Sequence, residues 1–336
     1  MRPTIRDVAQ RAGVSIATVS RVLRDSDSVT DRTRDRVTTA VAELQFTPSQ
    51  LGRQLAERRH AANGIVFPDL AGPYYAEVVL GYEAVAAELG RSVLILSTHG
   101  RNAAPAMVED MANRCDGLVI LGRTVADEVV DRLAARGTPL VLLARPPAGR
   151  CDSVNAEGRT SAAKLTAHVL DQGARRLTFV GDPMDSPDVA ERWLGVSDSV
   201  NEAGAELSIE AVAGFGEEAG ARGATTLLDA PGGLAALPDA LICANDELAL
   251  GVLGALKDRG VDVPGQVMVT GWDDVMAARY AGLTTVRQPM RELGGTAARL
   301  LDEQISGSRT EPRHELLATE LIVRTSTAKQ SLRGQQ

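Results

Sequence analysis

The chain has 336 residues, of which 44% are hydrophobic, 24% charged and 3% aromatic, and its formal net charge is −8. This length is enough for two or three domains, and the composition is typical of a globular protein with aliphatic cores rather than of a disordered chain. No uncharged apolar run approaches the roughly 20 residues of a membrane span, and no signal peptide opens the chain, so we expect a cytoplasmic protein.

The basic charge is concentrated at the N-terminus. Residues 1–60 contain eleven arginines and seven acidic residues, a net of +4, which leaves −12 for residues 61–336. A small nucleic-acid-binding domain on an acidic carrier has this distribution, because phosphate neutralisation supplies most of the sequence-independent affinity for DNA.

The first residues predict two short helices around a tight turn. Thr4 is placed to cap the first helix, with Asp7 three positions later completing a capping box. Gly13 is suited to the left-handed position that ends this helix, and Ser15 is suited to cap the next one. Thr30 is expected to cap a third helix, so that residues 1–46 form a helix-turn-helix domain.

In a helix-turn-helix the second helix enters the major groove of DNA. Ile16, Ala17, Ser20 and Arg21 would then face the groove, and Arg21 has the donor geometry to bind guanine. Including caps and flanks, the residues expected at DNA in this domain are Thr4, Ser15, Ile16, Ala17, Thr18, Ser20, Arg21, Thr30, Arg32 and Thr33. The alternative is a small helical bundle that docks onto a protein.

Three successive motifs resemble the LacI/GalR family of bacterial regulators: DVAQRAGVSIATVSRVL, then VTDRTRDRV, then PSQLGRQLA. The resemblance extends over nearly the whole chain. It implies that residues 47–60 are a hinge helix and linker, with Leu55 inserted into the minor groove of operator DNA to kink it. The hinge residues that it places at DNA are Gln50, Arg53, Leu55 and Ala56.

Strand-like apolar runs alternate with helical stretches from residue 64 onward, first at 64–67, 93–96, 118–121 and 139–143, then at 177–181, 240–244 and 267–271. This alternation predicts parallel sheets with helices on both faces, and the two clusters predict two lobes. The fold class is therefore an N-terminal all-α helix-turn-helix domain followed by an α/β two-lobed, periplasmic-binding-protein-like sensor domain. We expect the sensor, which also dimerises, to span 61–330, with 61–155 and 289–318 in the first lobe and 156–288 and 319–330 in the second.

Ligands of such folds lie beyond the carboxyl ends of the strands, in a cleft between the lobes. The family resemblance implies an effector site at such positions, which contains Asp69, Tyr74, Tyr75, Arg145, Arg192, Asn245, Trp272 and Asp273. Adjacent tyrosines are also common in ordinary packing between lobes. For the family, carbohydrates are the most common effectors and nucleobases are a minority, so we expect a carbohydrate.

Other classes of protein are less consistent with the sequence. The nearest approach to a phosphate loop, GFGEEAG, has its third glycine misplaced and carries two glutamates, and the four histidines lie apart from any catalytic motif. Three separate cysteines, Cys115, Cys151 and Cys243, predict buried thiols rather than disulfides or a metal site. We expect no enzyme activity, no cofactor and no metal; a stand-alone binding protein would need a secretion signal and no DNA-binding head.

The prediction is thus a homodimeric repressor that binds a pseudo-palindromic operator in double-stranded DNA. A small-molecule effector would control it by binding with different affinity to two arrangements of the lobes. The C-terminal tail contains no leucine heptad, which favours a dimer over a tetramer.

Overall fold

The computed structural model describes residues 3–23, 28–46, 60–309 and 311–328. The chain divides into two compact units, Met1–Ala61 and Ala62–Gln336. Each unit is described by itself below.

The first unit is built from three helices: α1 (Ile5–Ala12), α2 (Ile16–Leu23) and α3 (Asp31–Glu43). Their small apolar side chains form one core, whose buried members are Val8, Ala9, Ala12, Val19, Val22, Val37, Ala40 and Phe46. Arg36 fastens α3 to the turn between the other two helices, since its Nη2 donates to the carbonyl oxygens of Ala12 and Gly13. The expected helical domain is present in this form.

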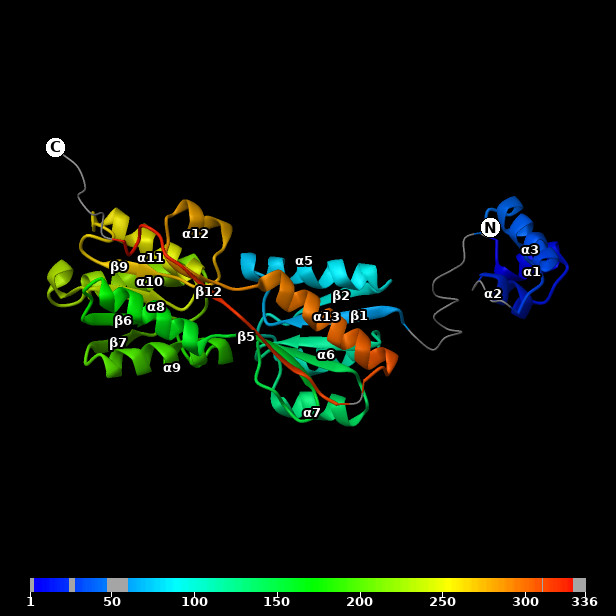
Figure 1. Ribbon diagram of the computed structural model, residues 1–336, viewed down its shortest axis with the longest axis horizontal. Helices are drawn as coiled ribbons and strands as arrows, with labels where there is room; N and C mark the ends of the chain where they lie inside the picture. The colour runs from blue at the N-terminus through cyan, green and yellow to red at the C-terminus, as the bar shows by residue number, and fades with distance from the viewer. Residues whose placement is uncertain (1–2, 24–27, 47–59, 310, 329–336) are drawn as a thin grey trace. The chain divides into compact units, whose positions relative to one another are not determined.

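The second unit has two α/β lobes, which lie end to end in Figure 1. The first lobe is a six-stranded sheet in the order β11-β5-β4-β3-β1-β2. Its strands are β1 (Ala62–Phe67), β2 (Ser92–Ser97), β3 (Gly117–Leu121), β4 (Leu140–Leu143), β5 (Asp152–Ala156) and β11 (His314–Leu317), and each pairs in parallel with its neighbour.

Four helices cover the two faces of this sheet. On one face α5 (Pro73–Glu88) and α13 (Met290–Ser306) share a core with β1, β3 and β4. On the other face α6 (Ala104–Ala112) and α7 (Asp127–Ala135) pack on the opposite side chains of the same strands. Burial on both faces explains why these strands are continuous apolar runs.

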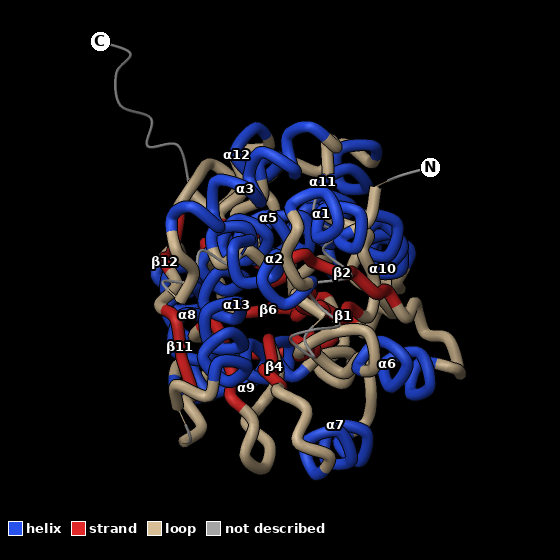
Figure 2. The backbone as a smooth tube through the Cα atoms, turned by 90° about the vertical axis from the view of Figure 1, so that its right-hand side faces the viewer, coloured by secondary structure: helices blue, strands red, loops and turns tan. Residues whose placement is uncertain are grey.

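The second lobe is a four-stranded parallel sheet in the order β7-β6-β8-β9. Its strands are β6 (Arg176–Val180), β7 (Glu206–Glu210), β8 (Ala240–Cys243) and β9 (Met268–Thr270), and its helices are α8 (Arg159–Asp171), α9 (Pro187–Glu202), α10 (Glu217–Asp229), α11 (Asp246–Asp258) and α12 (Met276–Tyr280). These helices share one core with the central strands, and the tube in Figure 2 shows the strands of this unit enclosed by helices. The predicted fold class is confirmed.

Three chain segments connect the lobes. The first follows β5, the second joins β10 (Thr285–Arg287) to α13, and the third joins β11 to β12 (Glu320–Ile322). β10 and β12 pair antiparallel in a separate two-stranded sheet. Each lobe is therefore assembled from segments that are far apart in sequence. In the residues that the structure describes, no helix is long and apolar enough to cross a membrane.

Candidate functional site

The turn between α1 and α2 is fixed by local hydrogen bonds. The backbone N–H of Thr4 donates to Asp7 Oδ2 at 2.7 Å, and the N–H of Asp7 donates to Thr4 Oγ1 at 3.4 Å, which completes the capping box. Gly13 ends α1 with φ 62°, and Ser15 Oγ accepts the N–H of Thr18 at 3.1 Å at the start of α2. These residues set the direction in which α2 leaves the turn.

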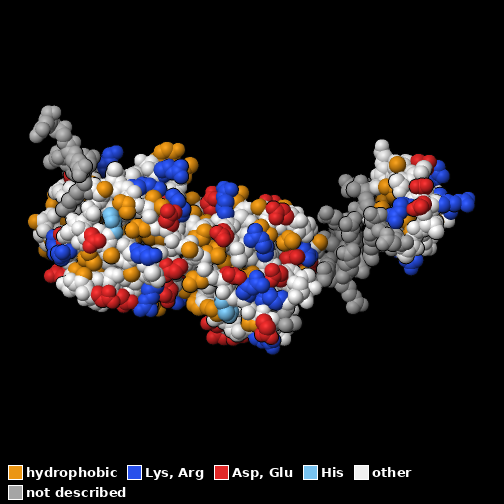
Figure 3. Space-filling model, viewed as in Figure 1, with side chains coloured by type: hydrophobic (Ala, Val, Ile, Leu, Met, Phe, Trp, Pro, Cys, Tyr) orange, Lys and Arg blue, Asp and Glu red, His pale blue; other side chains and the backbone are white. Residues whose placement is uncertain are grey.

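α2 presents one buried and one accessible face. Val19 and Val22 enter the core, whereas Ile16, Ala17 and Arg21 are exposed. Ile16 is 44% exposed, which is unusual for a large apolar side chain with a core close by. Figure 3 shows arginine side chains on the visible surface of this unit. An exposed helix face of this composition can enter a major groove, where apolar groups contact thymine methyls and arginine binds guanine.

The remaining residues predicted at DNA divide into two groups. Thr4, Ser15, Thr30 and Arg32 are exposed, and Thr18, Ser20 and Thr33 are half-buried. Gln50, Arg53, Leu55 and Ala56 lie outside the described residues, so the predicted hinge contacts stay a prediction.

A cavity of about 430 Å³ lies between the two lobes of the second unit. From the first lobe it is lined by Asp69 after β1, by Tyr74 and Tyr75 in the first turn of α5, and by residues that follow β2, β3 and β4. From the second lobe it is lined by the start of α9, the loop after β7, the start of α11 and Asp273 in the segment after β9. All of these positions follow the carboxyl ends of parallel strands, where α/β folds bind ligands.

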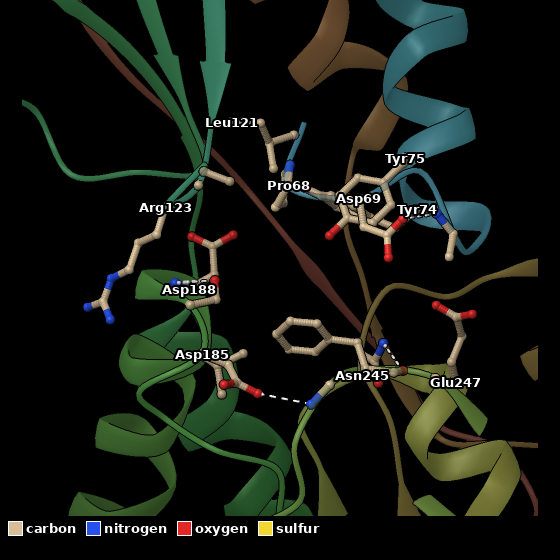
Figure 4. Close-up of a pocket in the computed structure, with 18 of the residues that line it drawn as sticks. Pro68, Asp69, Tyr74, Tyr75, Leu121, Arg123, Asp185, Asp188, Asn245 and Glu247 are labelled. Atoms are coloured by element: carbon tan, nitrogen blue, oxygen red, sulfur yellow. Dashed lines mark hydrogen bonds between the residues drawn. The ribbon is translucent and has the colours of Figure 1, made fainter. Parts of the chain in front are cut away.

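The first-lobe wall is aromatic. The rings of Tyr74 and Tyr75 meet edge-on with centroids 5.4 Å apart, and Tyr75 packs edge-on against Phe67 at 5.7 Å. Burial raises the pKa of Tyr75 to about 12, so its hydroxyl is neutral at physiological pH. Figure 4 shows both tyrosines and Asp69 on one side of the cavity, with Asp188, Asn245 and Glu247 on the other.

The second-lobe wall is polar and held in place by backbone contacts. Asn245 caps α11 through its Oδ1, which accepts the N–H of Leu248 at 3.0 Å, and its Nδ2 donates to the carbonyl oxygen of Phe215 at 3.0 Å. Arg192 Nη1 donates to the carbonyl oxygen of Ala244 at 2.6 Å. Side chains that are fixed in this way present a preorganised surface to a ligand.

The side chain of Arg192 stacks on the indole ring of Trp272. The Cζ atom of Arg192 lies 4.7 Å from the centre of the indole ring, a cation–π distance, and Trp272 itself is 2% exposed. Trp272 therefore contacts an arginine of the cavity lining and does not itself line this cavity.

Asp273 is the most buried carboxylate of the cavity lining, at 4% exposure. Its Oδ1 accepts a hydrogen bond from Gln288 Nε2 at 2.6 Å, and its backbone is held at φ 115°, outside the region that L-residues favour. Burial raises the pKa of this carboxyl to about 7, although Arg192 and Gln288 act in the opposite direction. The group thus changes charge near physiological pH.

Arg145 departs from the predicted site. It follows β4, but its side chain is buried within the first lobe, where Nη1 donates to the carbonyl oxygens of Gly122 and Val125 at 3.2 and 2.8 Å and Nη2 pairs with Asp127. It does not line the cavity. The other predicted residues, Asp69, Tyr74, Tyr75, Arg192, Asn245 and Asp273, are brought together there.

Several lining residues were missed from sequence. His99 pairs with Asp69, with 3.2 Å between Nδ1 and Oδ1, and Asp188 lies one helical turn before Arg192. Glu247 is two residues beyond Asn245 and Phe215 follows β7. The rule that ligands lie at strand ends identifies His99 and Glu247, and the spacing of four residues identifies Asp188.

Comparisons with known proteins agree with both units. Residues 4–49 match the family of bacterial regulatory proteins described as the lacI family, and residues 166–327 match a periplasmic binding protein-like domain. The HTH-type transcriptional regulator RegA of Clostridium saccharobutylicum is 30% identical over 338 residues, which cover 97% of this chain and all of RegA.

Solved structures show the same relationship. A Lac repressor dimer bound to operator and the anti-inducer ONPF aligns with a TM-score of 0.86 at 25% identity, over 98% of this chain and 100% of that one. A complex of the transcriptional regulator CelR with cellobiose aligns with a TM-score of 0.71 at 30% identity, over 97% and 100% of the two chains.

Proposed function

The chain belongs to the LacI family of bacterial regulatory proteins, as its motifs predict, and from this membership we propose how its cavity controls its binding to DNA. It is a DNA-binding transcriptional regulator with a helix-turn-helix unit and a two-lobed α/β unit. We propose that it acts in the cytoplasm as a repressor without enzyme activity, and that a sugar-like effector held between the lobes sets its affinity for a pseudo-palindromic operator.

The observation that carries this proposal is that both lobes contribute to one cavity. A ligand that touches Tyr75 on one lobe and Asn245 on the other stabilises the arrangement in which both are in reach. It changes operator affinity to the extent that it binds that arrangement more tightly than others. The three connecting segments allow such a movement while each lobe stays intact.

A sugar fits the chemistry of the walls. The apolar face of a pyranose or furanose ring packs on tyrosine rings, while its hydroxyls donate to carboxylates such as Asp273 and accept from arginine. The solved CelR complex contains cellobiose, which makes carbohydrates the first class to test.

The effector test uses the full chain and a panel of neutral and amino sugars, measured by calorimetry. Asp273→Ala is expected to weaken binding of any active sugar by more than about ten-fold, because a buried acceptor of its hydroxyls is lost. Asp258→Ala, on an exposed part of α11, is the matched control and should bind like wild type. Binding by none of the sugars, or equal binding by both variants, would contradict the proposed site.

The DNA test uses an operator selected by the protein from a random-sequence pool. Arg21→Ala is expected to relax the preference at one base pair in each half-site, with a cost of about 1–3 kcal/mol. Arg11→Ala is the control, because Arg11 pairs with Glu43 at 2.6 Å on a different helix. Unchanged base preference in Arg21→Ala would remove this residue from the proposed DNA contacts.

We propose that the regulator is a homodimer that pairs through the second unit. Large apolar side chains are exposed on the edge strand β2, where Leu94 and Ile95 are 39% and 47% exposed, and on α12, where Met276 and Tyr280 are 75% and 82% exposed. Figures 1 and 2 place α5, beside β2, and α12 on the same side of this unit. Exposed apolar side chains mark interfaces where they gather on one surface, and the proposed dimer interface would cover both groups.

The oligomeric state is tested by sedimentation of the wild type and an Ile95→Asp, Tyr280→Asp double variant. A dimer that becomes a folded monomer in the variant supports the proposed surface. A wild-type monomer at micromolar concentration with selected operator present would contradict the dimer.

A further inference from the structure

The charge of the cavity lining is strongly unbalanced. Its five carboxylates are Asp69, Asp185, Asp188, Glu247 and Asp273, whereas its only arginines are Arg123 and Arg192. Arg123 is exposed, and its guanidinium donates to the carbonyl oxygen of Met184 at 2.7 Å. Figure 4 shows Arg123 at the edge of the cavity. Arg192 is therefore the one buried cation that faces five acidic groups.

Arg192 does not neutralise these carboxylates by ion pairing. Its Nη1 is bonded to a backbone carbonyl, its Nε is buried without a partner, and it forms no ion pair with a carboxylate of residues 60–309 and 311–328. Asp273 has one oxygen bonded to Gln288, and no hydrogen bond from the described residues reaches the other oxygen. Burial raises the pKa of Asp188 although the charge of Arg192 acts in the opposite direction, and burial together with the charge of Glu217 raises the pKa of Glu247.

Among the described residues, no three carboxylate, histidine or cysteine side chains converge closely enough to hold a metal. The acidic groups lie beside the tyrosine rings and across the cavity from them. Tyr74 lies in the fields of both Asp188 and Asp273, and its hydroxyl is buried without a hydrogen-bond partner. Aromatic faces together with spaced carboxylates bind organic ammonium groups through cation–π and ionic contacts.

We propose that the effector is a polyhydroxylated molecule with a protonated amino group, which lies between Asp188 and Asp273 while the body of the molecule packs on Tyr74 and Tyr75. This inference rests on the proposed effector function of the same cavity and narrows its ligand class. It excludes effectors with phosphate or carboxylate groups, because such an anion would enter a site that is lined by five carboxylates and be repelled by their like charges.

Matched sets of probes test the charge directly. The full chain is titrated by calorimetry with glucosamine, galactosamine and mannosamine, with the corresponding neutral hexoses, and with their 6-phosphates. In at least one set the amine should bind about ten-fold tighter than the hexose, since hydrogen bonds to charged groups are stronger than neutral ones, and no phosphate should bind. A hexose that binds as tightly as its amine, a phosphate that binds, or three amines that all fail to bind would each overturn the inference.

Removal of one negative charge provides the second test. Asp188→Asn keeps the size of the side chain and should reduce the preference for the amine over the hexose by about ten-fold. Asp258→Asn, an exposed change of the same kind, should keep the wild-type preference. An unchanged preference in Asp188→Asn would overturn the assignment of the amino group. If either test fails but a hexose still binds, the proposal of an amino group is wrong, whereas the proposal of a sugar-controlled regulator is retained.

Discussion

Asp273 combines burial with a position in the ligand cavity, and this combination makes its charge dependent on pH. A carboxyl whose pKa is raised in the folded state contributes stability below its unfolded pKa, and this contribution is lost as pH rises through the folded value of about 7. Without ligand, the wild type should therefore lose stability between pH 5 and pH 8.

Asp273→Asn removes this titration and keeps an oxygen for Gln288. Relative to wild type, the variant should gain on the order of 3 kcal/mol on going from pH 5 to pH 8, as measured by chemical denaturation at the two pH values. Parallel pH profiles for the two proteins would show that another group is responsible.

Asp152 has the opposite behaviour. It is fully buried, and although burial alone would raise its pKa, hydrogen bonds from Arg309, from Gln304 at 2.7 Å and from the backbone N–H of Arg313 at 2.7 Å lower it. Its contribution to stability is present above its unfolded pKa and is lost as pH falls through the lowered folded value.

Asp152→Asn removes the fully buried charge of this network and leaves the half-buried Arg309 with Glu303 as its charge partner. We expect a loss of roughly 3 kcal/mol in the free energy of unfolding at pH 7, measured by denaturant titration. Asp198→Asn, which breaks an exposed pair with Arg159, is the control and should remain close to wild type. Equal stability of the two variants would contradict the importance of the buried network.

At the scale of elements, the helices α5 and α13 cross closely because glycines lie at the contact. A Cβ atom on Gly81 would lie 1.9 Å from the carbonyl oxygen of Arg291, and one on Gly294 would lie 2.0 Å from that of Val78. Both helices pack on the same face of the first-lobe sheet, and Tyr74 and Tyr75 at the start of α5 pack against this core. Their separation is therefore set by main-chain contact.

Gly81→Ala should force these helices apart and cost about 1–3 kcal/mol in unfolding free energy. Gly254→Ala, in the exposed face of α11 with open space around it, should instead stabilise by up to about 1 kcal/mol through helix propensity. Thermal denaturation of both variants checks the opposite signs, and the same sign in both would contradict the close crossing.

The strands differ in how far the sequence predicts them. β1, β3, β4, β6 and β8 are central and apolar, so short hydrophobic runs identify them. β7 is an edge strand with exposed Glu206. β5 begins with buried Asp152 and Ser153, whose side chains form hydrogen bonds with Arg313 and His314. Hydrophobic periodicity does not encode partners that are more than 150 residues away.

The sequence predicts a residue of the cavity lining when that residue follows directly after a predicted strand and its side chain points into the cavity. That rule places Asp69, Asn245 and Asp273 correctly in the lining, because each follows a strand that the sequence predicts. It fails for Arg145, which also follows a strand, because carbonyl groups of Gly122 and Val125 draw its guanidinium into the first lobe. Long side chains reach several environments, and their sequence position does not choose among them.

At the scale of the whole molecule, the two compact units have separate cores, so they should respond separately to ligand. An effector that binds the lobes should raise the melting temperature of the second unit by mass action and leave that of the first unit unchanged. Calorimetry of the full chain with and without an active sugar checks this expectation. An equal shift of every transition would show that the two cores unfold together.

The interleaving of the lobes also bears on how the protein is made. The first lobe needs α13 and β11, which follow the second-lobe elements α8 to β10 in sequence. The strand β12, which pairs with β10, comes after both. On a ribosome the N-terminal unit can fold as soon as it emerges, whereas the first lobe must wait until about residue 317 has been synthesised. A chain that is truncated earlier would have a complete helix-turn-helix unit but an incomplete first lobe. Such truncated regulators should therefore no longer respond to the effector.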